Sequence, residues 1–313
     1  MIAVHSIRTD RFRLALQSYG GPAMITPMLN IMGLSAWTIR QQFDSFVLVT
    51  DDAGAEMARQ CKLPYTDIVS VGESFDSHPC FWTHSKFKAY LQDRPFVHFD
   101  NDLFLWEPLP ARLMEAPVFA SHADTYMWGT YAEHIASLEQ SIGLKGLHNK
   151  HFTNRMPVNM SMFGGNDTEA IGQFSSLVTD FVAGRNGFRD LDEDQQDRVM
   201  RGMHVFEQLW GSCFIQNELG IPITLALADD EILSNQPARD VKVTHLHGLK
   251  YAAQTQPNSE AAKLMYKVSS KLIDLAPEIS LAIVDSGLDF GLLPSSERGL
   301  NNDSTVTNEP AHN

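Results

Sequence analysis

Asp100 and Asp102 follow directly after an apolar run at 95–99, so two carboxylates lie two residues apart where a buried strand is expected to stop. Neighbouring carboxylates repel each other, and placing them beside apolar surface is costly. A divalent cation relieves both problems, and oxygen ligands suit Mg²⁺ or Mn²⁺. Such a cation would neutralise charge on a departing diphosphate. The alternative interpretation is an ordinary turn, because Asp and Asn favour turns.

Polar residues also follow two other apolar runs. Asp51 ends the run at 46–49, where it either caps the next helix or lies at a ligand site. His245 and His247 end a late run and precede Lys250. Imidazole is acceptable to Mn²⁺ and less so to Mg²⁺, so one of these histidines is a candidate metal ligand. A satisfied structural histidine is the alternative.

A third group of candidates could contact a polar ligand. Glycine lets a backbone approach a ligand closely, and asparagine can bond hydroxyls in two directions, which makes Asn159, Gly164 and Gly165 candidates. The alternative for this segment is a tight turn after a strand. Glu207 lies in an expected helix and would act as a general base if burial raised its pKa. A solvated helix face is the alternative there.

The first 120 residues alternate short apolar runs with helix-like stretches. We expect strands at 2–7, 46–49, 67–71 and 95–99, and helices at 27–42, 53–62 and 81–93. This rhythm is typical of an α/β fold with a mostly parallel sheet flanked by helices. In such sheets, ligands bind beyond the carboxyl ends of the strands, where Asp100 and Asp102 are expected.

The rest of the chain has a less regular pattern. Residues 121–159 contain no clear strand and are expected to form an irregular lid or binding loop, whose Tyr126, Trp128 and Tyr131 either stack on sugar rings or form a small core. Later segments favour helices at 168–183, 205–219 and 258–275, and strands at 222–227 and 241–246. We expect one domain over 1–255, a helical extension over 256–294 and a disordered tail over 295–313.

Composition excludes several classes of protein. The 313 residues contain 24 Lys plus Arg and 38 Asp plus Glu, so the formal net charge of −14 disfavours binding to nucleic acid. No apolar run approaches the roughly 18 residues of a membrane-spanning helix. The beginning of the sequence does not read as a secretory signal, and three widely spaced cysteines fit a reduced chain, so we expect a cytoplasmic protein.

The stretch 95–108 resembles the DxD motif of the GT-A type nucleotide-sugar glycosyltransferases, and 244–250 is similar to the HxxGxxK element of family-8-like members. The resemblance implies a GT-A, Rossmann-like fold. It also implies that Asp102 and either His245 or His247 hold the metal, that Asp100 contacts the metal or the ribose and sugar of the donor, and that Lys250 meets the diphosphate. Lys250 comes one residue earlier than in the family's element.

Other motifs follow in the order that this family implies. The resemblance implies that Asp51 contacts the base or ribose, and that Lys86 in segment 82–90 is aimed at the donor, although a solvated helix face is the alternative for Lys86. Segment 157–167 resembles the family's N-x-G-hydrophobic-x-G-G segment, which implies that its asparagine and glycine pair line the sugar pocket. An acidic residue near Glu207 would face the acceptor.

The expected function is therefore transfer of a sugar from a nucleotide diphosphate sugar to a hydroxyl of a carbohydrate or other acceptor, with Mn²⁺ or Mg²⁺ as cofactor. Two other classes stay open. One is a non-catalytic nucleotide- or carbohydrate-binding protein on the same fold, and the other is a metal-dependent phosphohydrolase that uses the same carboxylates. Donor hydrolysis with and without an acceptor would separate them.

Overall fold

The apolar runs of the first half form the strands of a central sheet. The computed structural model describes the chain except for residues 19–20, 125–127, 144–156, 228–239, 247–259 and 291–313. The strands are β1 Ile2–Ser6, β2 Phe46–Thr50, β3 Asp67–Ser70, β4 Phe96–Phe99, β5 Leu103–Leu105, β6 Val118–Ala123, β7 Val158–Gly165, β8 Ile223–Leu225 and β9 Val243–His245.

Helices connect and cover these strands. They are α1 Thr9–Ser18, η1 Gly21–Met24, α2 Ile25–Arg40, α3 Asp52–Gln60, α4 His84–Ala89, α5 Ala111–Met114, α6 Trp128–Ile142, α8 Thr168–Ala183, η4 Asn186–Phe188, α9 Glu193–His204, η5 Val205–Trp210, α10 Gly211–Cys213, η6 Phe214–Glu218, α13 Glu260–Leu275 and α14 Pro277–Asp285. Within the described ranges, no helix combines the length and the apolar character that crossing a membrane requires.

Among the described residues, seven strands form one sheet in the order β3-β2-β1-β4-β7-β6-β8. β1, β2, β3 and β4 are parallel, β7 runs antiparallel to both β4 and β6, and β6 is parallel to β8. The expectation of a mostly parallel α/β sheet flanked by helices is therefore confirmed. The chain moves outward from β1 to β3 and then crosses to β4 on the other side of β1. The order reverses at this point, which opens a crevice at the carboxyl ends of β1 and β4.

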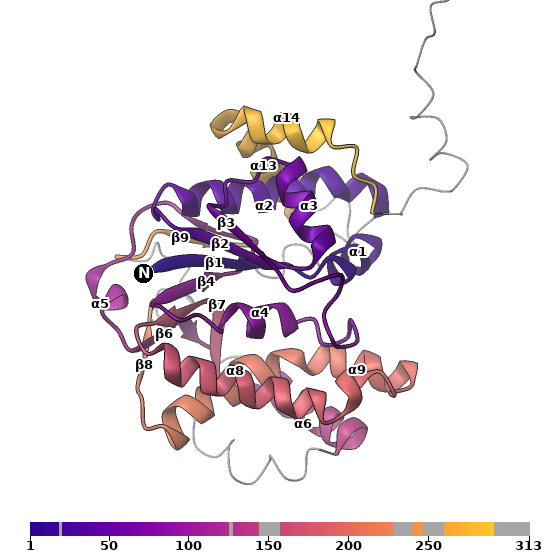
Figure 1. The fold of residues 1–313 in the computed structure, drawn as a ribbon, viewed down its shortest axis with the longest axis vertical. Helices are drawn as coiled ribbons and strands as arrows, with labels where there is room; N and C mark the ends of the chain where they lie inside the picture. The colour runs from indigo at the N-terminus through magenta and orange to yellow at the C-terminus, as the bar shows by residue number, and fades with distance from the viewer. Residues whose placement is uncertain (19–20, 125–127, 144–156, 228–239, 247–259, 291–313) are drawn as a thin grey trace, which may run out of the picture.

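Helices pack on both faces of the sheet. α2, α3, α13 and α14 lie above it in Figure 1, while α4, α6, α8 and α9 lie below. β1, β2 and β4 are buried along their length because both faces of the sheet are covered there, whereas the edge strand β3 is mostly exposed. The helical extension belongs to the same core, since Leu272, Ile279 and Ile283 of α13 and α14 pack with Leu29 and Ile31 of α2.

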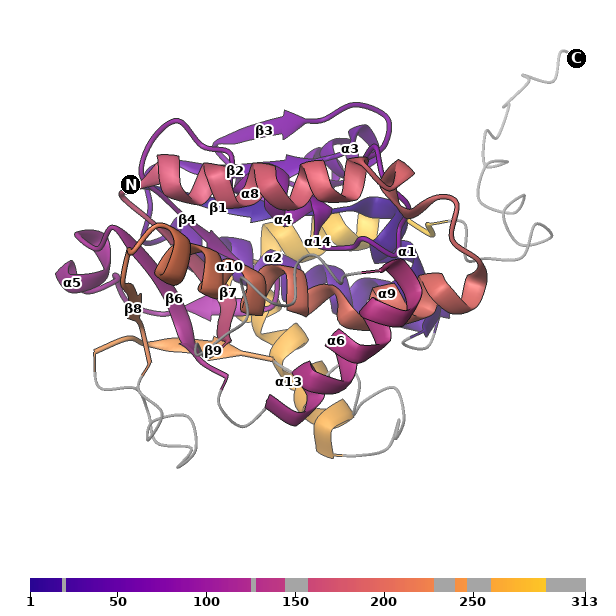
Figure 2. The same cartoon turned by 90° about the horizontal axis from the view of Figure 1, so that it is seen from below.

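A second, two-stranded sheet joins distant parts of the sequence. β5 pairs antiparallel with β9, and the register places Leu103 opposite His245. The turned view in Figure 2 shows β9 on the opposite side of the molecule from β3. This small sheet is important for the site because it brings a late histidine beside the segment that follows β4.

Two expected elements differ from the structure. The helix expected over 81–93 is limited to the short α4, because the residues before it form turns around a buried arginine. The irregular loop expected over 121–159 contains the helix α6, whose Tyr131, Ile135 and Leu138 are buried at helical spacing. The spacing of these three residues, at intervals of four and then three, is a helical signal in the sequence. The polar and aromatic composition of the segment favoured a loop instead.

Candidate functional site

A cavity with a volume of about 460 Å³ lies in the crevice at the carboxyl ends of β1 and β4. β6 is parallel to β4 and also ends there, while the antiparallel β7 begins there. The wall of the cavity includes residues of β1, β4 and β7, residues that follow β1, β4 and β6, and residues of the surrounding helices. Those that bear on function are Arg8, Arg11, Trp82, Lys86, Asp100, Asp102, Asp124, Tyr131, Asn159, His204, Gln208 and His245.

Asp100, Asp102 and His245 converge on one side of this cavity. Each offers one ligand atom, and these atoms lie within 4.8 Å of one another. His245 Nε2 is 3.5 Å from Asp102 Oδ1 and 4.0 Å from Asp100 Oδ2. The end of β4, the tight turn closed by the Leu103 N–H to Asp100 carbonyl bond, and the register of β5 with β9 position the three side chains. Two carboxylates and an imidazole fit Mn²⁺ well.

Lys86 extends from α4 to the other oxygen of Asp100. Its Nζ is 2.7 Å from Asp100 Oδ1 and 2.9 Å from Glu207 Oε1, and it lies 5.8 Å from the centre of the Trp82 ring. Burial alone would lower the pKa of Lys86, but the attraction of Asp100 and Glu207 is larger and raises it above its ordinary value. Lys86 is therefore a fixed cation at the wall of the cavity.

Glu207 lies behind Lys86 and is fully buried. Its Oε1 accepts hydrogen bonds from Lys86 and from the Tyr90 hydroxyl at 2.8 Å. Burial raises the pKa of Glu207, and the attraction of Lys86 opposes this shift. Glu207 does not line the cavity, so the expectation that it faces an acceptor hydroxyl is wrong for this structure. The next residue, Gln208, lines the wall instead.

A further group of polar side chains lines the same cavity. Asp124 follows β6 directly, and the Tyr131 hydroxyl lies 3.1 Å from its Oδ2 and within hydrogen-bonding reach of Gln208 Oε1. Asn159 lies near the start of the buried strand β7, and its Oδ1 accepts from the Ser161 N–H at 3.0 Å. His204 Nε2 is 2.8 Å from His134 Nδ1. Asn159 was expected at the site, and the structure places it there.

Sequence reasoning missed Asp124, Gln208 and His204. A signal was available for Asp124, since it follows an apolar run in the same manner as Asp100. No local pattern marked Gln208 or His204, because their approach to the cavity depends on how the helix running from α9 into η5 packs against the sheet.

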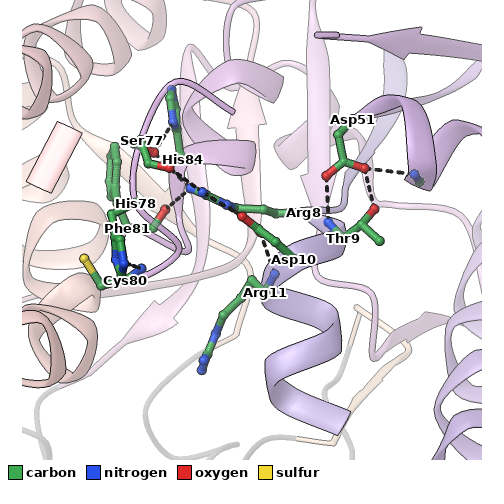
Figure 3. A network of polar contacts seen from close by, with 11 residues as sticks. Arg8, Thr9, Asp10, Arg11, Asp51, Ser77, His78, Cys80, Phe81 and His84 are labelled. Carbon is green, nitrogen blue, oxygen red and sulfur yellow. Dashed lines mark hydrogen bonds and ion pairs between the residues drawn. The ribbon is translucent and has the colours of Figure 1, made fainter. Parts of the chain in front are cut away.

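Asp51 has a structural role in place of the expected contact with a nucleotide. It is buried, caps the N-terminus of α3 by accepting from the Gly54 N–H at 2.8 Å, and also accepts from the N–H and the hydroxyl of Thr9 (Figure 3). It does not line the cavity. The helix-cap alternative is the correct one for this residue, which also ties the start of α1 to α3.

Arg8 organises the neighbouring loop, although it lies at the cavity wall. Its guanidinium donates to both carboxylate oxygens of Asp10, to the hydroxyl and carbonyl of Ser77, and to the Phe81 carbonyl, as Figure 3 shows. His84 extends this network, since its Nδ1 lies 2.6 Å from the Ser77 hydroxyl. Arg8 therefore holds the 77–81 turn against α1 and fixes the start of α4, which carries Lys86.

Gly164 and Gly165 lie away from the cavity. They pair with Val97 and Phe96 at the beginning of β4, whereas Asp100 follows its end. A Cβ on Gly164 would lie 2.1 Å from the Phe96 carbonyl oxygen, and one on Gly165 would lie 2.0 Å from that of Pro117. The prediction that these glycines line a sugar pocket is therefore wrong, and packing of the sheet explains why side chains are absent.

Two expected site residues, His247 and Lys250, lie outside the described residues. Tyr126 also lies outside them. Of the other two members of the expected aromatic group, Trp128 begins α6. Tyr131 is almost fully buried and packs its ring against His204, so it belongs to the core while its hydroxyl reaches the cavity.

Comparison with known proteins supplies a family. No curated protein matches the chain. A family model described as "Family of unknown function (DUF6734)" matches residues 4–285, which is most of the sequence and includes every described residue of the candidate site. The chain therefore belongs to the DUF6734 family.

Proposed function

We propose that the protein is a metal-dependent glycosyltransferase that moves a sugar from a nucleotide diphosphate sugar to an acceptor hydroxyl. The observation that carries the proposal is the convergence of Asp100, Asp102 and His245 beside a cavity at the carboxyl ends of β1 and β4. Crevices at such a reversal of strand order are where open α/β sheets bind nucleotides.

The charges on one side of the cavity call for a cation. Asp100, Asp102 and Glu207 carry three negative charges, and Lys86 supplies one positive charge among them. Over these four side chains the net charge is therefore −2, and a cation held by Asp100, Asp102 and His245 would offset it. When bound there, Mn²⁺ or Mg²⁺ would neutralise charge on a departing diphosphate.

Different residues of the chain would contact the two ends of the donor. Lys86 and Arg11 line the cavity and would attract phosphate oxygens. Asp124, Asn159 and Gln208 also line it and offer carboxylate and amide groups, which suit hydroxyls of a sugar. In the transfer, the bond from the anomeric carbon to the diphosphate oxygen breaks and the nucleoside diphosphate leaves, a bond from that carbon to the acceptor oxygen forms, and the proton of the acceptor hydroxyl is released to solvent.

The buried thiols of Cys61, Cys80 and Cys213 support the further proposal that the protein works in the cytoplasm. The acceptor is proposed to be a carbohydrate or another molecule with a free hydroxyl.

Calorimetric titration of UDP and GDP, with Mn²⁺ present or chelated, tests the metal site. We expect nucleotide binding to require Mn²⁺, and Asp102→Asn to weaken Mn²⁺ binding by at least about 100-fold, beyond the roughly 10- to 100-fold losses typical of outer-shell changes. The exposed Asp93 provides a matched control, and Asp93→Asn should leave binding unchanged. If Asp102→Asn binds Mn²⁺ as the wild type does, the assignment of this site is wrong.

Turnover is tested by incubating the protein with a panel of nucleotide sugars, with and without hydroxyl acceptors. Release of nucleoside diphosphate that increases with an acceptor would support transfer. Tight binding of UDP or GDP without any release across the panel would favour a non-catalytic binding protein. Release of phosphate from simple phosphoesters would favour a metal-dependent phosphohydrolase.

A further inference from the structure

Glu207 is buried behind the wall of the cavity, yet it contacts Lys86, which in turn contacts Asp100 of the proposed metal site. Its side chain is fully buried, and its Oε1 accepts from Lys86 Nζ at 2.9 Å. Lys86 Nζ in turn lies 2.7 Å from Asp100 Oδ1. The three groups therefore form a row that leads from the core to the cavity, in the order Glu207, Lys86, Asp100.

The two oxygens of Asp100 have different neighbours. Oδ1 faces Lys86, whereas Oδ2 faces His245 at 4.0 Å, on the side where Asp102 Oδ1 also lies. A cation between the aspartates and His245 would therefore take Oδ2, with Oδ1 still held by the ammonium. Lys86 fixes the orientation of this carboxylate and also competes with the cation for its charge.

We propose that Glu207 is a positioning residue for the metal site. Its negative charge offsets the positive charge of Lys86, which would otherwise weaken the attraction of Asp100 and Asp102 for the cation. This inference rests on the proposed metal site. It differs from the role expected from the sequence, in which Glu207 removes a proton from the acceptor. Glu207 touches neither the cavity nor any group that would react, so it acts only through Lys86.

Neighbouring contacts support this role. Tyr90, which is itself fully buried, donates its hydroxyl to the same oxygen of Glu207 at 2.8 Å, and the carboxylate is thereby fixed on the side of Lys86. Arg8, the other buried cation near the cavity, is paired with Asp10 and with backbone carbonyls, so it does not replace Lys86 in this balance. Within the part of the chain that the structure describes, the Lys86 ammonium is the cation in direct contact with Asp100 Oδ1.

The test is a titration of Mn²⁺ alone, followed by the electron paramagnetic resonance signal of the free ion. Glu207→Gln keeps the shape and the hydrogen bonds of the side chain but removes its charge. We expect this variant to bind Mn²⁺ about 10- to 100-fold more weakly, the loss typical of outer-shell changes. Glu278→Gln, an exposed change of the same kind on α14, should leave the affinity unchanged.

The double variant Lys86→Met/Glu207→Gln separates charge balance from a merely structural role. The double variant removes one positive and one negative charge, so the net charge over Asp100, Asp102 and positions 86 and 207 is the same as in the wild type. We therefore expect the affinity for Mn²⁺ to return to within about threefold of the wild-type value. Failure of Lys86→Met to rescue Glu207→Gln would overturn the proposal, because a structural role predicts that the two losses accumulate.

Further outcomes distinguish this inference from the proposed function. If the wild type does not bind Mn²⁺, the proposed metal site and this inference both fail. If the wild type binds Mn²⁺ and Glu207→Gln binds it equally well, only this inference fails. Thermal denaturation shows whether each variant is folded. Should Glu207→Gln alone not fold, Lys86→Met is compared with the double variant: equal affinities are expected, and a tenfold difference contradicts the proposal.

Discussion

Asp51 and Asp100 are similar in sequence, since each follows an apolar strand, but their surroundings give them different roles. Asp51 accepts hydrogen bonds from Thr9 and Gly54, which satisfy a buried carboxylate within the protein. Asp100 has Lys86 on one oxygen and the cavity on the side of the other. At the residue scale, the difference between a structural and a functional carboxylate is therefore the set of donors that the fold places around it.

A substitution of Asp51 tests this distinction. Asp51→Ala should lower the free energy of unfolding by about 2 kcal/mol or more, because it removes a helix cap and leaves the partly buried donors of Thr9 without their acceptor. Asp167→Ala removes a simpler cap, that of α8, and should cost about 1 kcal/mol. Urea denaturation measures both values. Binding of Mn²⁺ should be unchanged in Asp51→Ala, and a loss of that binding would contradict the structural role.

At the scale of elements, a stretch of π-helix sorts two successive residues to different places. α9 continues into η5, a π-helical segment that carries Glu207 and Gln208. Glu207 is turned into the core toward Lys86, and Gln208 faces the cavity. π-Helical turns are rare in proteins, and those that occur are often found at functional sites. Here the segment places Glu207 in the core behind the cavity wall and Gln208 in the wall itself.

β7 provides the prediction at this scale. Gly164→Ala should destabilise the protein by about 1–3 kcal/mol or more, because the added Cβ would meet the backbone of Phe96, which has no freedom to move within the sheet. Gly172→Ala is the control: it lies in α8 with no neighbouring atom within 4 Å, and should stabilise the protein by up to about 1 kcal/mol. Denaturation curves measure the free energy of unfolding of both variants. A Gly164→Ala variant as stable as the wild type would contradict the packing explanation.

At the scale of the whole molecule, buried histidines couple the fold to pH. Burial, with a smaller contribution from His98, lowers the pKa of His5 to about 3, and burial together with Arg8 and Lys88 lowers that of His84 to about 3. Burial also lowers the pKa of His98 well below its ordinary value. Between the lowered values and 6.5, the unfolded chain binds more protons than the folded protein, so the free energy of unfolding falls as the pH falls.

The expected size follows from these shifts. Each histidine that stays neutral in the folded protein should lower the free energy of unfolding by up to about 2 kcal/mol at about pH 5 relative to about pH 7. Glu207, whose pKa burial raises, acts in the opposite direction but is a single group. Urea denaturation at the two pH values measures the loss. In His84→Asn the dependence on pH should be shallower than in the wild type, and an unchanged dependence would contradict the assignment.

Much of the fold could be predicted from local pattern. Strands buried on both faces read as continuous apolar runs, so β1, β2 and β4 were expected close to where they lie, and α8 was expected at its observed bounds. α6 was missed because polar and aromatic residues obscured its helical spacing. No local pattern predicts that β7 is antiparallel to β4 and β6. Its direction depends on the path of the chain between β6 and β7, which the spacing of apolar residues does not record.

The sequence by itself determined where the carboxylates of the site would lie, because Asp100 and Asp102 follow a buried strand and must emerge at the carboxyl edge of the sheet. Only the tertiary structure decided which residues join them. His245 arrives through the pairing of β9 with β5, and Glu207 is turned away from the cavity toward Lys86. Such contacts join segments far apart in the chain, and their partners are chosen by packing and charge in the folded core, which local spacing does not record.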